Sequence, residues 1–421
     1  MAGFRLLKMR LDLKKFLPFR HLKKLRILPE RRKWDGKSPL RIGFYTDTYL
    51  PNVDGVVNAM IGYKGELERR GDQVYIFTSG TDREGREFGG PRTFFFESLV
   101  FPPYPQYKLA IFPLNSIRVA KKHKIDLVHS HAVASMGVAA IASAKVLNLP
   151  LIGTFHTMMP KTAFYLTKNP LGKKVFAQFA WTAVRQFYAP FDLVTAPSKV
   201  IEKMLNKNGI DRTAIVPNGL DVKKFSPKND SRIIRKLLGI GKRQKVILTA
   251  GRLSEEKNVE VLISAFAKVR KTQDAKFVIQ GDGPAKPKYM KHAARLGLQK
   301  DVIFTGFVKD FEVPYFYSAA DVFATASTFE TQGLALLEAM ATGRVCVGAK
   351  SLAIPEILND GKNGFLFRPF DIQDCAEKML KGLHLSETRK RDMERRARAT
   401  ALEYSVDKST DKLMDAYRKV L

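Results

Sequence analysis

Short apolar segments rich in β-forming residues alternate with helix-like segments along this chain, and the alternation starts twice. The first series of predicted strands is Leu40–Tyr45, Gln73–Thr78, Leu127–His129, Leu151–Thr154, Leu193–Ala196 and Ala214–Val216. The second series is Lys245–Thr249, Lys276–Gln280, Val302–Thr305, Asp321–Ala324 and Val345–Gly348. Because alternating strands and helices build parallel sheets, we expect an α/β fold with two Rossmann-like, doubly wound parallel-sheet domains. These domains would face each other across a cleft, with ligands at the carboxyl ends of the strands.

The polar stretch Lys223–Asn229 separates the two series. We divide the chain into a basic amphipathic tail over residues 1–38, an N-terminal domain over residues 39–225 and a C-terminal domain over residues 226–421. The last helix is a candidate for packing back on the N-terminal domain. A chain of 421 residues with 45% hydrophobic residues can bury two cores. Its two cysteines, Cys346 and Cys375, argue against a disulfide scaffold.

Positive charge is concentrated in the tail. The formal net charge of the whole chain is +31, and residues 1–40 contain 13 basic and 3 acidic side chains. Such a segment suits an in-plane anchor on an anionic membrane leaflet, and the alternative is a solvated basic arm. The uncharged run Ala132–Ala144 is shorter than a membrane-spanning helix, and the first residues do not resemble a signal peptide. We expect a cytoplasmic protein that associates peripherally with an anionic membrane surface.

A first motif, Gly251-Arg252-Leu253-Ser254-Glu255-Glu256-Lys257-Asn258, lies between a predicted strand and a predicted helix. Arg252 and Lys257 therefore stand at a strand end beside a helix N-terminus. The helix dipole and free amides favour anions there, so the two cations suit a diphosphate. The alternative is a solvated turn with a surface ion pair between Glu256 and Lys257.

A second motif contains two glutamates that are eight positions apart. Glu330 lies in a loop after a predicted strand, and Glu338 lies in the helix that follows, for which Gly343 is placed as a C-terminal stop. Two carboxylates in this arrangement can hold hydroxyl groups at two points of one ligand. The alternative for Glu330 is stabilisation of the helix terminus.

The two motifs together resemble glycosyltransferase family 4, the retaining nucleotide-sugar transferases of the GT-B type. The resemblance runs from about residue 40 to the carboxyl terminus. It also includes Thr46–Pro51, Asp54–Val56, Gly153–Thr157, Val216–Asp221, Gly281–Pro284 and Thr305–Phe307. Within the family, Glu330–Gly333 and Thr46–Pro51 look most like the branch that glucosylates diacylglycerol and related membrane lipids.

The resemblance implies roles for individual residues. Arg252 and Lys257 would bind the donor diphosphate, Glu330 the hydroxyls of the donor sugar, and Glu338 the ribose. Charge chemistry agrees, because breaking the anomeric bond leaves negative charge on the diphosphate, which two fixed cations stabilise. The predicted donor-binding set is Gly251, Arg252, Lys257, Gly281, Glu330, Gly333, Leu334 and Glu338. The predicted catalytic set is His156, Arg252, Lys257 and Glu330, and Asp54, Gly55 and His156 form the predicted acceptor side.

The sequence contains no Asp-x-Asp pattern of the kind that holds a divalent ion in the other nucleotide-sugar transferase fold. We therefore expect no metal site and no cofactor. The co-substrate would be a nucleotide sugar, namely a UDP- or GDP-hexose.

A stretch without acidic residues bears on the acceptor. Residues 127–191 contain six basic side chains, which are Lys145, Lys161, Lys168, Lys173, Lys174 and Arg185. Apolar and aromatic residues are interleaved with them, including Phe164, Tyr165, Phe176, Phe179, Trp181, Phe187 and Tyr188. A basic, aromatic surface suits a lipid headgroup interface. The alternative is a core helix with one solvated face.

These observations favour a retaining transferase that moves a hexose to a diacylglycerol-like or phospholipid-like acceptor at the cytoplasmic membrane surface. One alternative is a soluble transferase that extends a polysaccharide or a small sugar acceptor. Another is a basic nucleic-acid-binding protein, which we disfavour because the sequence shows no helix-turn-helix, RNA-recognition or zinc module.

Overall fold

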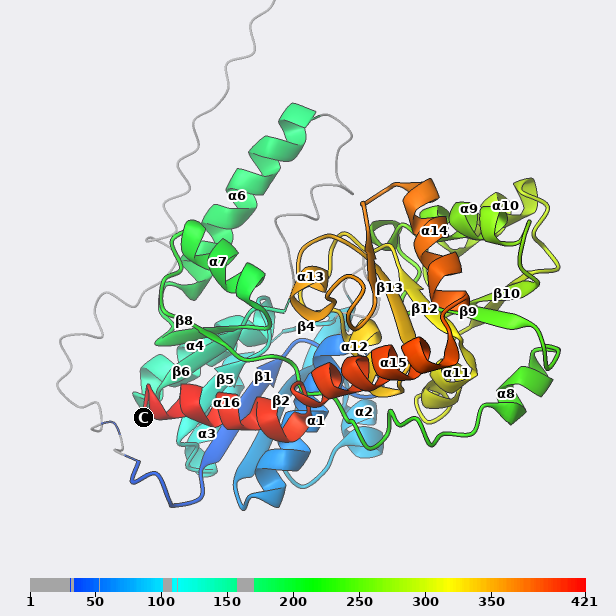
Figure 1. Ribbon diagram of the computed structural model, residues 1–421. Helices are drawn as coiled ribbons and strands as arrows, with labels where there is room; N and C mark the ends of the chain where they lie inside the picture. The colour runs from blue at the N-terminus through cyan, green and yellow to red at the C-terminus, as the bar shows by residue number, and fades with distance from the viewer. Residues whose placement is uncertain (1–30, 32–33, 53, 101–107, 112, 157–169) are drawn as a thin grey trace, which may run out of the picture.

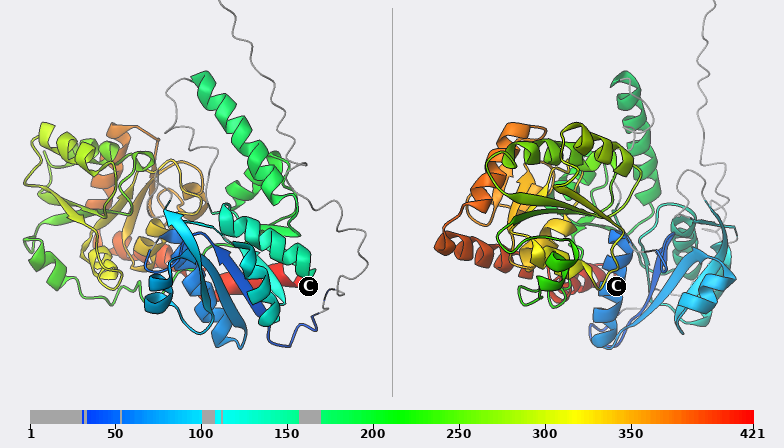
Figure 2. Two further views of the ribbon diagram at one scale, coloured as in Figure 1. Left: turned by 180° about the vertical axis from the view of Figure 1, so that it is seen from behind. Right: turned by 90° about the vertical axis from the view of Figure 1, so that its right-hand side faces the viewer.

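The computed structural model describes residues 31, 34–52, 54–100, 108–111, 113–156 and 170–421. Within these residues the chain forms two sheets that are flanked by helices (Figures 1 and 2). The strand order is β4-β3-β2-β1-β5-β6-β7-β8 in the first sheet and β11-β10-β9-β12-β13-β14 in the second. In each sheet the chain adds strands first on one side of its first strand and then on the other. The strand order therefore reverses between β1 and β5 and between β9 and β12. The predicted α/β fold with two doubly wound parallel sheets is confirmed.

The strands of the first sheet are β1 (Arg41–Thr46), β2 (Gln73–Gly80), β3 (Thr93–Val100), β4 (Lys108–Ala110), β5 (Leu127–Ser130), β6 (Leu151–Thr154), β7 (Leu193–Ala196) and β8 (Thr213–Ile215). The strands of the second sheet are β9 (Lys245–Ala250), β10 (Ala275–Gln280), β11 (Val302–Gly306), β12 (Val322–Thr325), β13 (Val345–Ala349) and β14 (Phe365–Phe367). Every predicted strand is present, with ends shifted by no more than two residues.

The helices of the first half are α1 (Gly55–Arg69), α2 (Asp82–Phe88), the 3-10 turn η2 (Pro113–Asn115), α3 (Ser116–Lys122), α4 (Ser135–Leu147), α6 (Pro170–Tyr188) and α7 (Lys199–Lys207). Those that follow are α8 (Arg232–Leu237), the 3-10 turn η4 (Glu255–Lys257), α9 (Val259–Val269), α10 (Lys286–Arg295), α11 (Val313–Ala319), α12 (Leu334–Ala341), α13 (Ile354–Ile357), α14 (Ile372–Leu383), α15 (Glu387–Leu402) and α16 (Val406–Arg418).

Strands β3, β4 and β14 were not predicted from the sequence. β4 and β14 have three residues each and lie at sheet edges, so they are too short to show a periodic pattern. β4 also pairs antiparallel with β3, with Leu99 opposite Leu109, whereas the other described strand pairs are parallel. A short antiparallel hairpin breaks the alternation of strand and helix on which the prediction rested.

The central strand β1 is buried on both faces, as is typical of a parallel sheet. Successive side chains of a strand point to opposite faces. Ile42 and Phe44 join a buried cluster with residues of α1 and α16. Tyr45 stacks on Phe77 within the cluster that α4 covers on the other face.

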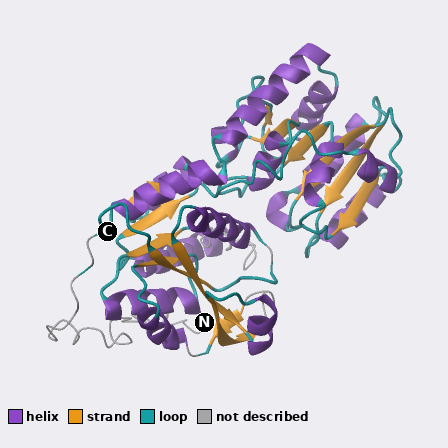
Figure 3. Cartoon of the chain, turned by 90° about the horizontal axis from the view of Figure 1, so that it is seen from below, coloured by secondary structure: helices purple, strands orange, loops and turns teal. Residues whose placement is uncertain are grey.

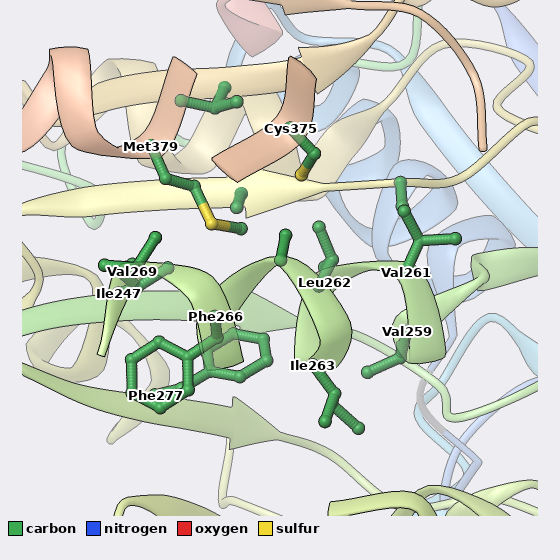
Figure 4. Close-up of a cluster of buried hydrophobic side chains, with 14 of the residues drawn as sticks. Ile247, Val259, Val261, Leu262, Ile263, Phe266, Val269, Phe277, Cys375 and Met379 are labelled. Carbon is green, nitrogen blue, oxygen red and sulfur yellow. The ribbon is translucent and has the colours of Figure 1, made fainter. Parts of the chain in front are cut away.

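In the core beside the second sheet, side chains of α9 pack against residues of β10 and against residues of α14 (Figure 4). Phe266 of α9 meets Phe277 of β10, with ring centroids 5.5 Å apart, and Cys375 and Met379 of α14 belong to the same buried cluster. The motif Gly251–Asn258 ends where α9 begins, at Val259. Because α9 is buried, the end of this motif is held in place. The packing of this core therefore positions Lys257.

The last helix, α16, leaves the second half of the chain and packs against the first sheet, as Figures 1 and 3 show. Arg70, at the end of α1, forms ion pairs with Asp407 and Asp411 of α16, at 2.8 Å and 2.6 Å. Tyr417 of α16 is buried, and its hydroxyl lies 2.9 Å from Nδ1 of His129. The C-terminal segment thus completes the core of the N-terminal half.

Candidate active site

The site residues of the second half follow β9 and β12, the two strands at which the strand order reverses. Loops leave such neighbouring strands in opposite directions, so a crevice opens at their carboxyl ends. The segment Gly251–Asn258 follows β9, and the loop that carries Glu330 follows β12. A pocket at this point is lined by Thr249, Gly251, Arg252, Lys257, Glu330 and Gly333, among others.

An ion pair joins the two loops. Lys257 Nζ donates a hydrogen bond to Glu330 Oε1 at 2.7 Å. Burial alone would raise the pKa of Glu330, but the charge of Lys257 and hydrogen bonds from Lys257 and Ser327 outweigh it and lower that pKa. Glu330 is therefore ionised at neutral pH, with its carboxylate at the edge of the pocket.

Asn258 fixes the geometry of this pair. It adopts a left-handed backbone conformation with φ of 49°, which asparagine tolerates better than most residues. Its side-chain amide donates to the carbonyl of Ala326 at 3.1 Å and to the hydroxyl of Thr328 at 3.3 Å. The motif after β9 is thereby tied to the loop after β12 immediately beside Lys257.

Arg252 is the more accessible of the two predicted diphosphate ligands, because about half of its side chain (52%) is exposed. Its guanidinium lies 3.3 Å from Oε1 of Glu256, which also accepts a hydrogen bond from Ser254 Oγ at 2.6 Å. An exposed pair of this kind contributes little stability. The guanidinium is thus oriented by Glu256 while it remains open to a ligand in the pocket.

Two glycines bring the loops after β9 and β10 into close contact. Gly281 has φ of 122°, and a Cβ atom there would clash with the backbone carbonyl of Gly251. Gly251 N donates to Gln280 O at 3.0 Å, and Leu253 N donates to Asp282 O at 2.8 Å. Gly281 lies outside the pocket, so the structure supplies a packing reason for this glycine, while its predicted contact with the donor stays a prediction.

The N-terminus of α12 points at the same pocket. Gly333 precedes the helix with φ of 90°, a left-handed conformation that favours glycine, and α12 begins at Leu334. Gly333 and Ala335 line the pocket. The positive end of the helix dipole therefore adds to the field of Lys257 and Arg252.

Glu338 lies one turn further along α12 and outside this pocket. Its Oε2 accepts a hydrogen bond from the hydroxyl of Tyr317 at 2.6 Å. Burial raises the pKa of Glu338 to about 7, although Tyr317 and the charge of Lys224 oppose the rise. Glu338 therefore changes its charge near neutral pH, which the sequence alone did not predict.

On the side of the first sheet, Asp54 caps α1. Its Oδ1 accepts hydrogen bonds from the backbone amides of Val56 and Val57, both at 2.9 Å. Burial raises the pKa of Asp54, against the effect of these amides and of the charge of Arg252 in the other half. A Cβ atom on Gly55 would lie 3.6 Å from Leu334, so the N-termini of α1 and α12 face each other.

His156 lies two residues after the end of β6, at the carboxyl edge of the first sheet. Its Nε2 lies 2.9 Å from Nδ1 of His131, the residue that follows β5. Burial lowers the pKa of His156 to about 4, so its ring is neutral at physiological pH. The sequence reading did not single out His131, although the His-Ser-His spacing at a strand end was a signal available for it.

Contacts between the two halves hold the loop of Glu330, and the sequence reading missed them. Gln332 is buried and exchanges two hydrogen bonds with the backbone of Asn218, at 2.7 Å and 2.9 Å. Ser198 Oγ donates to the carbonyl of Thr331 at 2.6 Å. Glu356 accepts from the amides of Lys199 and Val200, and so caps α7 from the other half.

The structure divides the stretch without acidic residues between core and surface. Tyr188 is buried in the core of the first half, so the expectation of an aromatic surface is wrong for this residue, and Trp181 and Phe187 are half-buried and pack against the same core. Phe179 and Val175 are 71% and 59% exposed on α6, which projects away from both sheets (Figure 1). Lys161, Lys168, Phe164 and Tyr165 lie outside the described residues, as does the tail apart from Arg31 and residues 34–38.

Two properties of the described part of the chain bear on metal binding and on the membrane. Across its described ranges, no group of three or more His, Cys, Asp or Glu side chains is arranged to hold a metal ion. None of the helices in that same part combines the length and the apolar character needed to cross a membrane.

Comparison with known proteins finds relatives over most of the chain. Residues 53–224 match the family described as Glycosyltransferase Family 4, and residues 230–400 match glycosyl transferases group 1. Alpha-monoglucosyldiacylglycerol synthase of Streptococcus pneumoniae is 31% identical over 351 residues, which cover 82% of this chain and 78% of that protein. The protein of the same name from Acholeplasma laidlawii is 30% identical over 338 residues, which cover 78% of this chain and 85% of that protein.

Solved structures share the architecture. The Anabaena protein HepE, crystallised with UDP-glucose, superposes with a TM-score of 0.71 over 90% of this chain and 100% of that one, at 21% identity. At this level of identity the likeness shows a common fold.

Proposed function

This chain belongs to glycosyltransferase family 4 and is a hexosyltransferase of the GT-B fold, and from that premise we propose that it transfers a hexose from a nucleotide sugar to a membrane lipid. The transfer would retain the anomeric configuration. The acceptor would be diacylglycerol-like or phospholipid-like.

The observation that carries the donor side of this proposal is the arrangement of charges at the β9–β12 switch point. Arg252, Lys257 and the N-terminus of α12 present positive charge to one pocket, and the Glu330 carboxylate stands beside them. A nucleoside-diphosphate sugar carries anionic phosphates next to a sugar ring whose hydroxyl groups donate hydrogen bonds. Cations suit the first group and a carboxylate suits the second.

In this arrangement Arg252 and Lys257 would bind the diphosphate of a UDP- or GDP-hexose. As the anomeric bond breaks, negative charge grows on the diphosphate, and fixed cations with a helix dipole stabilise that charge without reorganising. Glu330 would hold sugar hydroxyls, and Glu338 those of the ribose. Metal ions have no role in this proposal, because the two cations would supply the positive charge that a divalent ion supplies to the diphosphate in other transferases.

Three observations support a lipid acceptor. The relatives from S. pneumoniae and A. laidlawii are named as synthases of a glucosylated diacylglycerol. Helix α6 exposes Phe179 and Val175 where it projects from the body of the protein. Residues 1–40 carry a large excess of basic side chains, and each Lys or Arg near an anionic surface contributes about 1 kcal/mol to membrane binding.

The test supplies the full chain with radiolabelled nucleotide sugars together with either vesicles that contain diacylglycerol or soluble glycans. Label in the lipid phase is expected. Label in the glycan alone would contradict the lipid acceptor and show that the acceptor is a soluble glycan.

A second arm removes Met1–Lys37 and compares sedimentation of both forms with anionic and neutral vesicles at low and high salt. Truncation should reduce binding to anionic vesicles and leave donor binding intact, and salt should weaken the binding of the full chain. Unchanged vesicle binding after truncation would show that the tail is not the anchor. Preferential binding of duplex DNA over anionic vesicles would favour a nucleic-acid partner instead.

A further inference from the structure

Three histidines lie together at the carboxyl edge of the first sheet, and the proposed reaction uses only one of them. His129 is in β5, His131 follows β5, and His156 follows β6. The rings of His131 and His156 are 5.2 Å apart and nearly parallel, at 26°. His131 Nδ1 and His156 Nε2 are 2.9 Å apart, which is hydrogen-bond distance.

We propose that His131 is a positioning residue that fixes the tautomer of His156. In this assignment Nδ1–H of His131 donates to Nε2 of His156, so that His156 keeps its proton on Nδ1. His156 then offers an N–H donor, rather than a lone pair, to a hydroxyl or phosphate oxygen of the substrate. This inference rests on the proposed function for the identity of that substrate.

The choice of tautomer follows from a single proton between two neutral rings. Burial lowers the pKa of both His131 and His156, so neither ring is protonated at neutral pH. One of the two facing nitrogens must therefore donate and the other accept. If His131 donates, its second nitrogen, Nε2, has a lone pair. If His156 donates, Nε2 of His131 carries the proton.

Nε2 of His131 is buried and has no hydrogen-bond partner among the described residues. The neighbouring His129 cannot supply one, because its two nitrogens already bond Tyr417 and Thr154, at 2.9 Å and 2.7 Å. If His156 donated, His131 would carry its proton on this buried atom, as an N–H without an acceptor. Buried N–H groups without acceptors are rarer in proteins than under-satisfied acceptors, so the structure favours a lone pair at Nε2 and a proton at Nδ1.

The backbone around His131 is held in place by Tyr45, in β1, and by Asp47, in the segment that follows β1. The amide of His131 donates to the carbonyl of Tyr45 at 2.8 Å. The buried carboxylate of Asp47 accepts from the amides of Ala134 and Met136 and from the hydroxyl of Ser135, at 2.9–3.0 Å. Asp47 thus fixes the loop from His131 to α4, and His131 in turn fixes the ring of His156.

The experiment measures the tautomer of His156 directly. Carbon and nitrogen chemical shifts of the imidazole, in full-length protein labelled with ¹³C and ¹⁵N at histidine, distinguish a proton on Nδ1 from one on Nε2. The His156→Gln variant assigns the signal. We expect the proton of His156 on Nδ1 in the unaltered protein, and a proton on Nε2 would overturn the assignment.

Two variants of His131 test the cause. His131→Phe keeps a ring but cannot donate, so His156 should populate both tautomers and kcat should fall about tenfold, the scale expected for one lost hydrogen bond. His131→Asn places an amide near the position of Nδ1 and should restore most of both readouts. His123→Phe, at a histidine elsewhere in the first half, is the matched control and should change neither.

A purely Nδ1-protonated His156 in folded His131→Phe would overturn the role of His131, and the Asn variant and the spectrum of the unaltered protein decide the case if the Phe variant does not fold. The spectra need no substrate. If they agree with the assignment while no donor sugar is transferred, the proposed function fails and the tautomer assignment stands.

Discussion

The ammonium of Lys257 lies 2.7 Å from the carboxylate of Glu330, although the two residues are 73 positions apart in the chain. Their ion pair links the loop after β9 to the loop after β12. One cation of the site is thus already compensated before any ligand binds. A diphosphate that approaches Lys257 competes with Glu330 for it, and a sugar hydroxyl can take up the carboxylate that is released. In the proposed function, this ion pair would therefore couple recognition of the diphosphate to recognition of the sugar.

Removing either charge of this pair, or the neighbouring charge of Arg252, should impair transfer. Lys257→Ala, Glu330→Gln and Arg252→Ala should each lower kcat/KM by at least tenfold, about 1.4 kcal/mol of transition-state stabilisation. Arg232→Ala removes an exposed cation of α8 that does not line the pocket, and it should leave kcat/KM unchanged. Full activity in the double variant Arg252→Ala, Lys257→Ala would contradict the assignment of the diphosphate site.

Transfer should continue after removal of metal ions, because in the proposed function Arg252 and Lys257 balance the charge of the diphosphate. The measurement is the initial rate before and after treatment with EDTA, with a chelated sample to which Mg²⁺ or Mn²⁺ has been returned. Complete loss of activity that only the metal restores would reveal a metal site that these two residues do not replace.

Glu338 should give donor binding a pH dependence near neutrality. Its pKa is raised to about 7, and an ionised carboxylate accepts hydrogen bonds from ribose hydroxyls better than a protonated one. The KM for the nucleotide sugar should therefore fall between pH 6 and pH 8. Glu338→Gln should have a higher KM without this pH dependence, and an equal dependence in both proteins would exclude Glu338 as its source.

The same carboxyl makes the fold less stable as pH rises. Between the ordinary pKa of a glutamate and about 7, the folded protein holds a proton at Glu338 that the unfolded chain has released. The free energy of unfolding should therefore decrease as pH rises through this window. Urea titrations of the unaltered protein and of Glu338→Gln at pH 5 and pH 8 measure the difference, which should be smaller in the variant.

Gly281 should tolerate no side chain. A Cβ atom there meets the carbonyl of Gly251, and the backbone φ of 122° is strained for any other residue. Gly281→Ala should lower the free energy of unfolding by at least the roughly 1–3 kcal/mol of backbone strain and raise the KM for the donor, because the loop of Arg252 must move. Gly297→Ala also has positive φ, but its Cβ enters open space, so it controls for strain without the clash.

Gln332 should be sensitive even to an isosteric change. Its amide both accepts from Asn218 N and donates to Asn218 O, and Gln332→Glu keeps only the first of these bonds. A buried carbonyl without its donor costs about 1–3 kcal/mol. We expect a lower urea midpoint and a lower kcat, because the loop of Glu330 loses its contact with the first half. A urea midpoint and rates equal to those of the unaltered protein would show that this contact is dispensable.

Much of the site could be predicted because it is local in the sequence. Gly251, Arg252 and Lys257 lie in one segment after one strand, and Gly333, Leu334 and Glu338 lie in another. Parallel strands place their carboxyl ends at one edge, so the two segments were expected to meet there. A strand, then a glycine, then the start of a helix can be recognised in this order from residue types alone.

Other relationships had no local signal. The donation from Ser198 to Thr331 and the cap that Glu356 provides for α7 join residues more than 130 positions apart. The exposed face of α6 could not be separated from its buried face by composition, because both faces carry aromatic residues. Which aromatic residues are buried depends on the core against which the helix packs.

The sequence by itself determined the two parallel sheets and the segments that line their carboxyl edges, since strand and helix periodicity, glycine placement and charge at a strand end act over a few residues. Only the tertiary structure decided that Lys257 pairs with Glu330, that α16 returns to the first sheet and that His131 meets His156. Such contacts are set by how helices pack on the sheets, and the resulting burial raises the pKa of Glu338 and lowers those of His131 and His156. Their energies depend on neighbours distant in the chain, which no local pattern specifies.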